Sequence, residues 1–452
     1  MGDRFLCWAA KNGYEEVVEL VLRRNDVNPN ESGWCALTPL CCAALSGHEG
    51  VVKILLSRRD VDPDKPDNDG QTPLFYAVQN GHEEVVKMLL GRGRVNPNTW
   101  SWYGITPLHC AAQNGHERIV AMLLGRRDII PDNPDYLFQT PLWYAAAYGH
   151  EVVVQMLLER GEVNPNTRSR SGLTPLHLAA RNGHERLVAM LLGRSGIALG
   201  SLDYINQTPL WYAAAYGHEV VVQMLLGQGE VNPNTPSWYG ITPLHCAAQN
   251  GHERIVAMLL GRSDIIPDNP DYRFQTPLWY AAAYGHEVVV QMLLGRSEVN
   301  PNTPGSYALT PLHCAAQNGH KRVVEMLLGR SDIASNNSDY NHQTPLLQAA
   351  AYGHEVVVRV LLGQSDVDPN KSDYQGRTPL WYAAENGNEV VVKILLGRGD
   401  VDPNKPDYLD RTPFWCAAQR GHTGVVALLH RLLVAPEYER PISHFSKTAP
   451  TQ

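Results

Sequence analysis

The distribution of apolar and polar residues predicts a short helix, a tight turn and a second helix over residues 107–124. Thr106 supplies a hydroxyl for the free N–H groups of the first helical turn, and Pro107 stands where a missing N–H costs nothing. Gly115 ends the first helix because glycine tolerates the left-handed conformation that follows a helix C-terminus. The second helix has an apolar stripe at helical spacing, formed by Ile119, Val120, Leu123 and Leu124. We expect the two leucines to be buried.

This unit recurs along nearly the whole chain. Its Thr-Pro pair returns at constant spacing, with no insertion or deletion, at positions 38, 72, 106, 140, 174, 208, 242, 276, 310, 344, 378 and 412. We call this spacing the repeat frame. It indicates a solenoid, in which each unit buries its apolar face against the next one. The units alternate in type, so the duplicated segment is two repeats long. Residues 101–160 and 237–296 differ at only three of sixty positions.

The residues of the repeat identify the solenoid better than its length does, since tetratricopeptides share a period of about 34 residues. The run from Thr174 to Ala180 (Thr-Pro-Leu-His-Leu-Ala-Ala), followed by Gly183-His184, closely resembles the ankyrin signature. The Trp and Tyr pattern of tetratricopeptides is absent at matching positions. The chain thus resembles an ankyrin repeat protein and is similar to the long arrays common in fungi. The resemblance implies an all-α solenoid of about thirteen helix-turn-helix units with β-hairpin or loop fingers.

The repeat pattern places the expected array at residues 1–434. Residues 1–30 form a degenerate first unit, whose Glu- and Arg-rich second helix is typical of an N-terminal capping repeat. Internal repeats fill residues 31–411, and a C-terminal repeat fills residues 412–434. That last repeat keeps its apolar residues, so we expect either the tail or another chain to cover it. The tail, residues 435–452, contains three prolines and is expected to be disordered.

Composition and charge narrow the classes of partner. The chain has 38 Lys and Arg against 46 Asp and Glu, a net charge of −8, and no long basic run, so nucleic acid is not expected as a partner. No stretch approaches the ~18 to 20 apolar residues that span a bilayer, and the first residues have no signal-peptide pattern. We expect a monomeric cytoplasmic protein, with the nucleus as the open alternative, that does not bind membranes.

Cysteine and histidine follow the repeat frame, which argues against a disulfide or a metal centre. Five of the eight cysteines share one slot, four residues after the repeat threonine. Stacked layers lie ~8 to 10 Å apart, beyond the about 7 Å between Cα atoms that a disulfide allows. Fifteen of the eighteen histidines occupy two slots, after Thr-Pro-Leu or after the glycine between the helices. No zinc-helix spacing, phosphate loop or nucleophile elbow is present, so we expect no enzyme activity, no cofactor and no metal.

Aromatic residues are the candidate binding residues. Four positions before the repeat threonine, most units carry a Trp or Tyr, namely Trp34, Trp102, Tyr136, Tyr204, Trp238, Tyr272, Tyr340, Tyr374 and Tyr408. By resemblance, this slot lies on the projecting finger. A second set precedes the glycine between the helices, a slot on the concave face of the family, and consists of Tyr148, Tyr216, Tyr284 and Tyr352. Such rings anchor interfaces because they combine a large contact area with a polar group.

We predict a principal contact surface that recurs at every second repeat, formed by Tyr136, Tyr148, Tyr204, Tyr216, Tyr272, Tyr284, Tyr340 and Tyr352. Pairs such as Gln113-Asn114 lie between these tyrosines and would add adaptable hydrogen bonds. The alternative is that each ring only packs against the adjacent finger and stiffens the array. A separate group replaces the signature histidine inside the first helix and is expected to pack between repeats, namely Trp143, Trp211, Trp279, Trp381 and Trp415.

The resemblance implies a non-enzymatic scaffold that binds a protein partner through its concave face and fingers. Two alternatives stay open. One is the sensor or regulatory arm of a larger protein, such as a fungal receptor of the nucleotide-oligomerisation type. The other is a receptor for small molecules or peptides that uses the tyrosines.

Overall fold

The computed structural model describes residues 2–24, 26–33 and 36–434, so the expectations for Trp34 and for the tail 435–452 lie outside the described residues. Within these residues the chain forms 26 α-helices and one 3₁₀ turn, η1 (Ser306–Ala308), and no strand. The fold is therefore the all-α repeat array that the sequence predicts. The chain divides into two compact units, Met1–Trp238 and Tyr239–Gln452. We call each helix pair a repeat and number the repeats 1 to 13 along the chain.

The helices of unit 1 are α1 (Gly2–Lys11), α2 (Glu15–Leu22), α3 (Pro39–Ser46), α4 (Glu49–Ser57), α5 (Pro73–Gln79), α6 (Glu83–Leu90), α7 (Pro107–Asn114), α8 (Glu117–Leu124), α9 (Pro141–Tyr148), α10 (Glu151–Leu158), α11 (Pro175–Asn182), α12 (Glu185–Leu192), α13 (Pro209–Tyr216) and α14 (Glu219–Leu226). Those of unit 2 are α15 (Pro243–Asn250), α16 (Glu253–Leu260), α17 (Pro277–Tyr284), α18 (Glu287–Leu294), α19 (Pro311–Gln317), α20 (Lys321–Leu328), α21 (Pro345–Ala351), α22 (Glu355–Leu362), α23 (Pro379–Glu385), α24 (Glu389–Leu396), α25 (Pro413–Arg420) and α26 (Thr423–Val434).

The first helix of each repeat begins and ends at the residues that its sequence indicates. In repeat 6 the Thr174 hydroxyl accepts a hydrogen bond from the His177 backbone N–H at 3.4 Å, and a proline occupies the first helical position. The helix ends at Gly183, whose φ of 72° is left-handed. The turn to the second helix is therefore encoded locally in every repeat that has the Thr-Pro and glycine pair.

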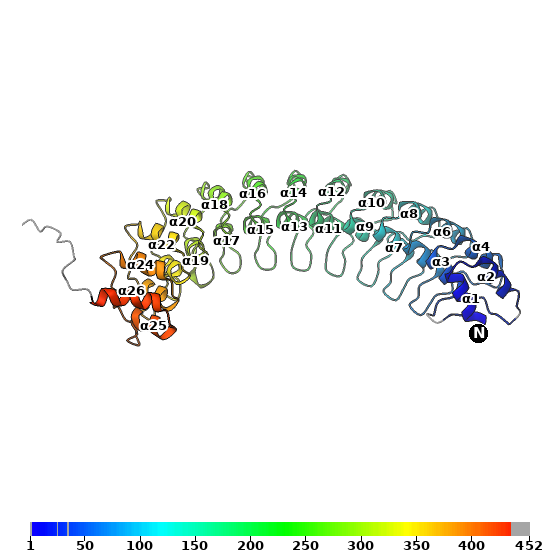
Figure 1. The fold of residues 1–452 in the computed structure, drawn as a ribbon. Helices are drawn as coiled ribbons and strands as arrows, with labels where there is room; N and C mark the ends of the chain where they lie inside the picture. The colour runs from blue at the N-terminus through cyan, green and yellow to red at the C-terminus, as the bar shows by residue number, and fades with distance from the viewer. Residues whose placement is uncertain (1, 25, 34–35, 435–452) are drawn as a thin grey trace, which may run out of the picture. The chain divides into compact units, whose positions relative to one another are not determined.

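The core of each unit is a continuous row of small and branched apolar side chains. Leu123 is fully buried, Leu124 is 8% exposed, and Ala111 and Ala112 of the first helix are fully buried, which confirms the expected burial of the leucine pair. First helices pack against first helices and second helices against second, as α7 does on α9 and α8 on α10. Within each unit the two kinds of helix form two layers, and the connecting loops project past the layer of first helices (Figure 1).

A buried histidine joins each repeat of one type to the repeat that follows it. The Nδ1 atom of His109 accepts from the Thr106 backbone N–H at 3.1 Å, so its Nε2 carries the proton and donates to the carbonyl oxygen of Gln139 at 3.0 Å. His177, His245 and His313 make the same pair of bonds. The structural role that the resemblance implies for this class of histidine is confirmed.

Tryptophan takes over this link in the other repeat type. Trp279 donates its Nε1–H to the carbonyl oxygen of Leu309 at 2.9 Å, and Trp381 donates to Arg411 at 3.0 Å, in both cases in the following repeat. The carbonyl is in the same frame as the one that His109 reaches. Trp143 has the same position, but its buried Nε1 has no hydrogen-bond partner among the described residues. The expected packing between repeats is thus observed at Trp279 and Trp381, together with a hydrogen bond that the sequence did not indicate.

The second class of histidine bonds backward to the preceding repeat. His150 contacts the carbonyl oxygen of Gln113 through Nε2 at 2.8 Å, and His422 contacts that of Glu385 at 2.9 Å. Each ring lies directly over the inter-helix glycine of the preceding repeat, where a Cβ atom on Gly115 would stand 2.5 Å from Nδ1 of His150. A glycine is therefore required there for two reasons, its left-handed backbone and the ring above it.

The forward histidines predict a loss of stability in acid. Burial lowers the pKa of His177 from its ordinary value of 6.5 to about 4. Between these two pH values the unfolded chain binds a proton that the folded chain does not, so stability falls as the pH drops from 6.5 to 4. From pH 7 to pH 5 the loss should be about 1 to 2 kcal/mol for this histidine.

A His177→Gln variant tests this by urea unfolding at both pH values. Glutamine does not titrate, so the variant should be less stable than the wild type at pH 7, and the difference should shrink at pH 5. A difference that is the same at both pH values would show that the folded-state pKa of His177 is not depressed.

Candidate protein-binding surface

Several fingers are held to their own repeat by a buried aspartate, whereas repeats 4, 6 and 8 have Ser101, Ser169 and Ser237 in the same slot. In repeat 5 the Asp135 backbone N–H donates to the carbonyl oxygen of Gln139 at 2.9 Å, and its Oδ1 accepts from the N–H groups of Leu137 and Gln139. The hydroxyl of Tyr144 donates to Oδ2 at 2.9 Å. Burial and the Asp135 carboxylate raise the pKa of Tyr144, so the hydroxyl stays a donor. The Phe138 N–H also donates to the carbonyl oxygen of Asp135 at 2.9 Å. These bonds close a tight loop, and no strand is formed in the described residues.

Neighbouring fingers are joined by backbone hydrogen bonds. The N–H of Tyr136 donates to the carbonyl oxygen of Tyr103 at 3.1 Å, and the N–H of Tyr340 donates to Tyr307 at 3.0 Å. The predicted finger tyrosines therefore have fixed backbones, while their side chains point into solvent and are 62% to 76% exposed at Tyr136, Tyr204, Tyr272 and Tyr340. The finger rings thus offer apolar area at a fixed position.

The second predicted set lies at the last turn of the first helix, or just after it. Tyr148, Tyr216, Tyr284 and Tyr352 are 52% to 59% exposed. The hydroxyl of Tyr148 accepts a hydrogen bond from Gln113 Nε2 at 3.2 Å, and Tyr284 and Tyr352 accept from Gln249 and Gln317. In unit 1 the guanidinium of Arg181 lies 5.7 Å from the centre of the Tyr216 ring, a cation–π contact. Each tyrosine therefore contacts the preceding repeat within its own unit.

Ring stacking fixes the orientation of these tyrosines. Tyr148 lies almost parallel to the His150 ring at 6.5 Å between centres and 14° between planes, and Tyr284 lies over His286 in the same way. Tyr216 stacks instead on Tyr212 at 6.4 Å. An exposed ring that is already oriented loses little side-chain entropy when a partner binds.

The amide side chains between the tyrosines are less free than the sequence suggested. Gln113, Gln249 and Gln317 hydrogen-bond to the tyrosines, and Asn114 donates to the carbonyl oxygen of Gln79 in the preceding repeat at 3.1 Å. Asn182 and Asn318 donate to carbonyls in the same way. The amides therefore stabilise the array and position the tyrosines, which corrects our expectation that they are adaptable donors for a partner.

Sequence reasoning missed a group of strained residues at the finger tips. Phe138 and Phe274 have φ values of 58° and 62°, and their rings are 57% and 67% exposed. The same slot holds Ala36, Asn206, Ala308, His342 and Asp410, all at positive φ, whereas other repeats have Gly70, Gly104, Gly172, Gly240 and Gly376 there. A non-glycine residue in this conformation costs about 1 to 2 kcal/mol. The sequence signal that could have revealed these residues is a side chain at a slot where other repeats have glycine.

The finger tips that carry the predicted tyrosines of unit 1 have little charge of their own. Residues 136–138 and 204–206 contain no ionisable group other than the tyrosine hydroxyls, but Arg168 lies 5.9 Å from the centre of the Tyr204 ring and Arg181 lies 5.7 Å from that of Tyr216. Among the described residues no three His, Cys, Asp or Glu side chains come together as a metal site requires. In the same part of the chain, no helix has both the length and the apolar character of a membrane span. The described cysteines are buried and none of them forms a disulfide bond, and burial raises the pKa of Cys110 to about 12.

The fold and this surface define a helical repeat protein with projecting finger loops, and the family comparison agrees. A family model described as ankyrin repeats in three copies matches overlapping segments at residues 6–99, 59–135, 95–169, 130–203, 195–271, 231–304, 262–339, 278–373, 329–407 and 346–439. The chain belongs to the ankyrin repeat family. Ankyrin repeats are generally modules for protein–protein contact, and proteins built from them are typically non-enzymatic. A comparison with curated proteins found no match.

The strained phenylalanines give a prediction with opposite effects on stability and binding. Changing Phe138 and Phe274 to Gly should leave the free energy of unfolding unchanged or raise it by up to about 1 kcal/mol, because glycine relieves the left-handed strain but is more flexible when unfolded. The same change removes two exposed rings, so binding of a partner that uses this surface should weaken. A Phe138→Ala, Phe274→Ala variant is the control, since it removes the rings and keeps the strain. If Phe→Gly lowered stability, the rings would be packing residues.

Proposed function

We propose that this chain is a non-enzymatic scaffold that binds a protein partner through the ladder surface, defined as Tyr136, Tyr148, Tyr204 and Tyr216 in unit 1 and Tyr272, Tyr284, Tyr340 and Tyr352 in unit 2. The observation that carries the proposal is that every one of these rings is more than half exposed while its backbone or its ring is fixed by the neighbouring repeat. Large, oriented aromatic rings on a rigid frame are the usual anchors of protein interfaces.

The chemistry of the surface favours a polypeptide with apolar or aromatic side chains. The rings present faces and edges that such groups can pack against, and the hydroxyls can hydrogen-bond to a partner's backbone. A polyanion is a poor fit because the chain carries a net charge of −8. We place the protein in the cytoplasm, with the nucleus as the alternative, from its composition.

One observation favours a peptide receptor as the second candidate. Residues 141–158, 209–226 and 277–294 are identical, so three of the four inner tyrosines sit in the same local sequence. Equal sites of this kind would bind one copy of a short ligand per pair of repeats, whereas a large protein partner would bind once per chain. Titration calorimetry separates the two by stoichiometry. A regulatory arm of a larger protein, such as a fungal receptor, is consistent with either, and the gene sequence upstream of Met1 would decide it.

The scaffold proposal is tested by changing the four inner tyrosines to alanine. Affinity capture with this variant beside the wild type should show loss of the bound partner, and a single Tyr284→Ala change should weaken binding by about 2 kcal/mol or more. The same single change should lower the free energy of unfolding by no more than about 1 kcal/mol, because the ring is half exposed and makes one solvent-accessible hydrogen bond.

A matched control lies on the second helices. Val152, Val220, Val288 and Val356 are exposed, recur at every second repeat and project from a different helix layer. Changing all four to Ala should leave partner capture at the wild-type level. Tyrosine variants that lose stability while still binding at full affinity would establish that the rings only pack.

A further inference from the structure

In the last repeat, the space over the inter-helix glycine is empty in the described residues, whereas in other repeats a histidine ring of the following repeat occupies it. A Cβ atom on Gly13, Gly115 or Gly387 would come within 3 Å of the histidine ring of the following repeat. Gly421 has the same left-handed backbone, with φ of 75°, but no heavy atom of the described residues lies within 4 Å of its Cβ position. Within the described part of the chain, no ring of a following repeat sits over Gly421.

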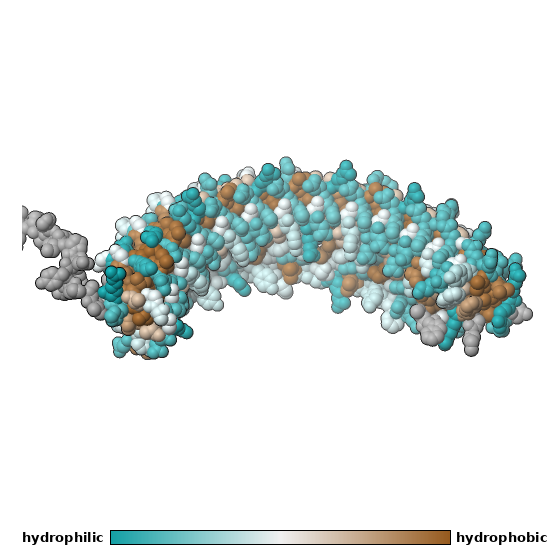
Figure 2. All heavy atoms as spheres, viewed as in Figure 1, coloured by the Kyte–Doolittle hydropathy of each residue, from teal (hydrophilic) through white to brown (hydrophobic). Residues whose placement is uncertain are grey.

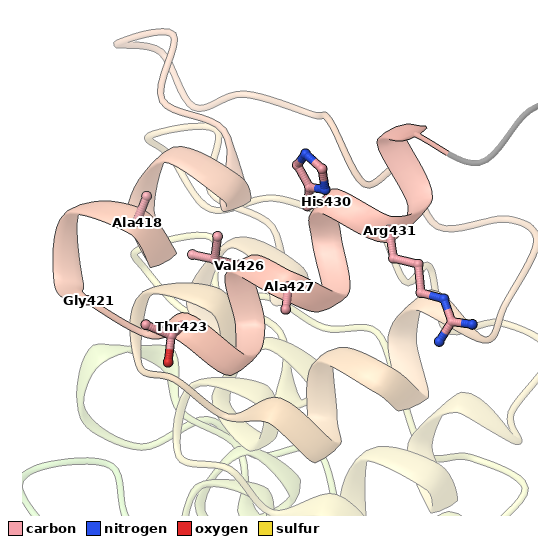
Figure 3. Close-up of a pocket in the computed structure, with 7 residues that line it drawn as sticks. All are labelled: Ala418, Gly421, Thr423, Val426, Ala427, His430 and Arg431. Atoms are coloured by element: carbon pink, nitrogen blue, oxygen red, sulfur yellow. The ribbon is translucent and has the colours of Figure 1, made fainter.

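The space over Gly421 is part of a larger apolar cavity of about 850 Å³. Figure 3 shows it along α25 and α26, lined by Ala418, Gly421, Thr423, Val426, Ala427, His430 and Arg431. Ala418 is exposed and Val426 partly exposed, whereas their counterparts one repeat earlier, Ala384 and Val392, are fully buried. Figure 2 shows apolar surface gathered at this end of unit 2. The cavity is thus the face on which a further repeat would pack.

Repeat 1 has two side chains, Tyr14 and Asn12, in the slots that contact a preceding repeat elsewhere along the chain. In the repeat frame, Tyr14 occupies the slot of the backward histidines, and Asn12 occupies the slot of Asn114. Tyr14 is 48% exposed and lies 5.3 Å from the equally exposed ring of Trp8. Asn12 donates to the carbonyl oxygen of Trp8 in its own helix, whereas Asn114 and Asn386 donate to the preceding repeat. Neither Tyr14 nor Asn12 contacts a preceding repeat within the described residues.

The polar residues at the two ends also complement each other. Glu16 has the slot of Arg118, whose guanidinium contacts Glu83 of the preceding repeat at 3.1 Å. Most second helices have Glu at the Glu83 position, which would repel Glu16, but the last repeat has Thr423 there. A threonine hydroxyl can donate to a carboxylate. Repeat 1 also carries Glu15 and Glu19, while Arg431 and His430 line the cavity.

We propose that the cavity on repeat 13 receives repeat 1 of a second copy of this chain, head to tail. The Tyr14 ring of one copy sits over Gly421 of the other, and its Asn12 amide donates to the carbonyl oxygen of Gln419. The contact continues the repeat frame from one chain into the next. Because it joins two different surfaces, a chain in such an assembly can bind one copy through repeat 1 and another through repeat 13. This inference departs from the monomer that composition led us to expect, and it does not depend on the ladder surface.

The hydrogen bond that an arginine makes to the preceding repeat has no counterpart in the proposed contact between repeat 1 and repeat 13. In other repeats an arginine donates to the last carbonyl of the preceding second helix, as Arg58 does to Leu22 at 2.8 Å and Arg398 does to Leu362. Arg24 has this slot in repeat 1, but its acceptor would be His430, which lies inside α26 because this helix runs on past the point where α24 ends. Arg24 therefore serves as an internal control.

Sedimentation velocity over a range of concentrations tests the proposal with the full chain. The wild type should rise in average mass above the 50.1 kDa of one chain as its concentration increases. Ala418→Glu, which places a charge in the cavity, and Tyr14→Ser, which removes the ring, should each raise the concentration needed for association by about tenfold or more. Arg24→Ala should associate like the wild type.

Mixing the two blocked variants gives a sharper result. Each has one intact end, so an equal mixture should form a species of two chains and nothing larger. A photo-crosslinking residue at Ala427 should link to repeat 1 of another copy. A wild-type chain that stays at 50.1 kDa at every concentration would overturn the proposal, and so would a crosslink from position 427 to residues 435–452 of the same chain, which would assign the cavity to the tail. Association that both variants leave unchanged would place the interface elsewhere and also overturn it.

Discussion

The whole array depends on hydrogen bonds from a side chain of one repeat to a backbone carbonyl of its neighbour. His109 reaches forward to Gln139, His150 reaches backward to Gln113, and Arg126 reaches back to Leu90. A helix pair as short as these cannot bury its own apolar face or satisfy all of its carbonyls. The neighbouring repeat supplies both the missing apolar contact and the missing donors. Stability is therefore a property of pairs of repeats.

The same bonds hold the backbone of the proposed ladder surface in place. His109 is anchored at the base of the next finger, the buried Asp135 closes that finger, and the finger's backbone bonds to the preceding finger. The exposed rings are consequently carried by backbone that has little freedom left. A partner that binds them would not have to order the loops, which removes a large part of the usual entropic cost of binding through loops.

Repeats 1 and 13 show how the side chains behave where the described residues provide a neighbouring repeat on one side only. Gly421 keeps its left-handed backbone without a ring above it, and Asn12 turns to its own helix for an acceptor. The repeat frame fixes the residue type at each position, so these residues are kept even where the described residues provide no neighbouring repeat to contact them. The apolar surface at both ends is the consequence, because side chains that are core residues in the middle of an array become surface residues at its ends.

The sequence by itself determined the helix pairs, their boundaries and the buried leucines, because Thr-Pro, the inter-helix glycine and the apolar spacing act within one repeat. It also placed the predicted tyrosines in regular slots. Only the tertiary structure decided what the neighbouring repeat does to each slot. Trp381 is 2% exposed and Trp415 45% exposed in the same slot, since a following repeat covers only the first. The left-handed backbone of Phe138 and the bond from Gln113 to Tyr148 likewise arise from contacts between neighbouring repeats, which no local pattern records.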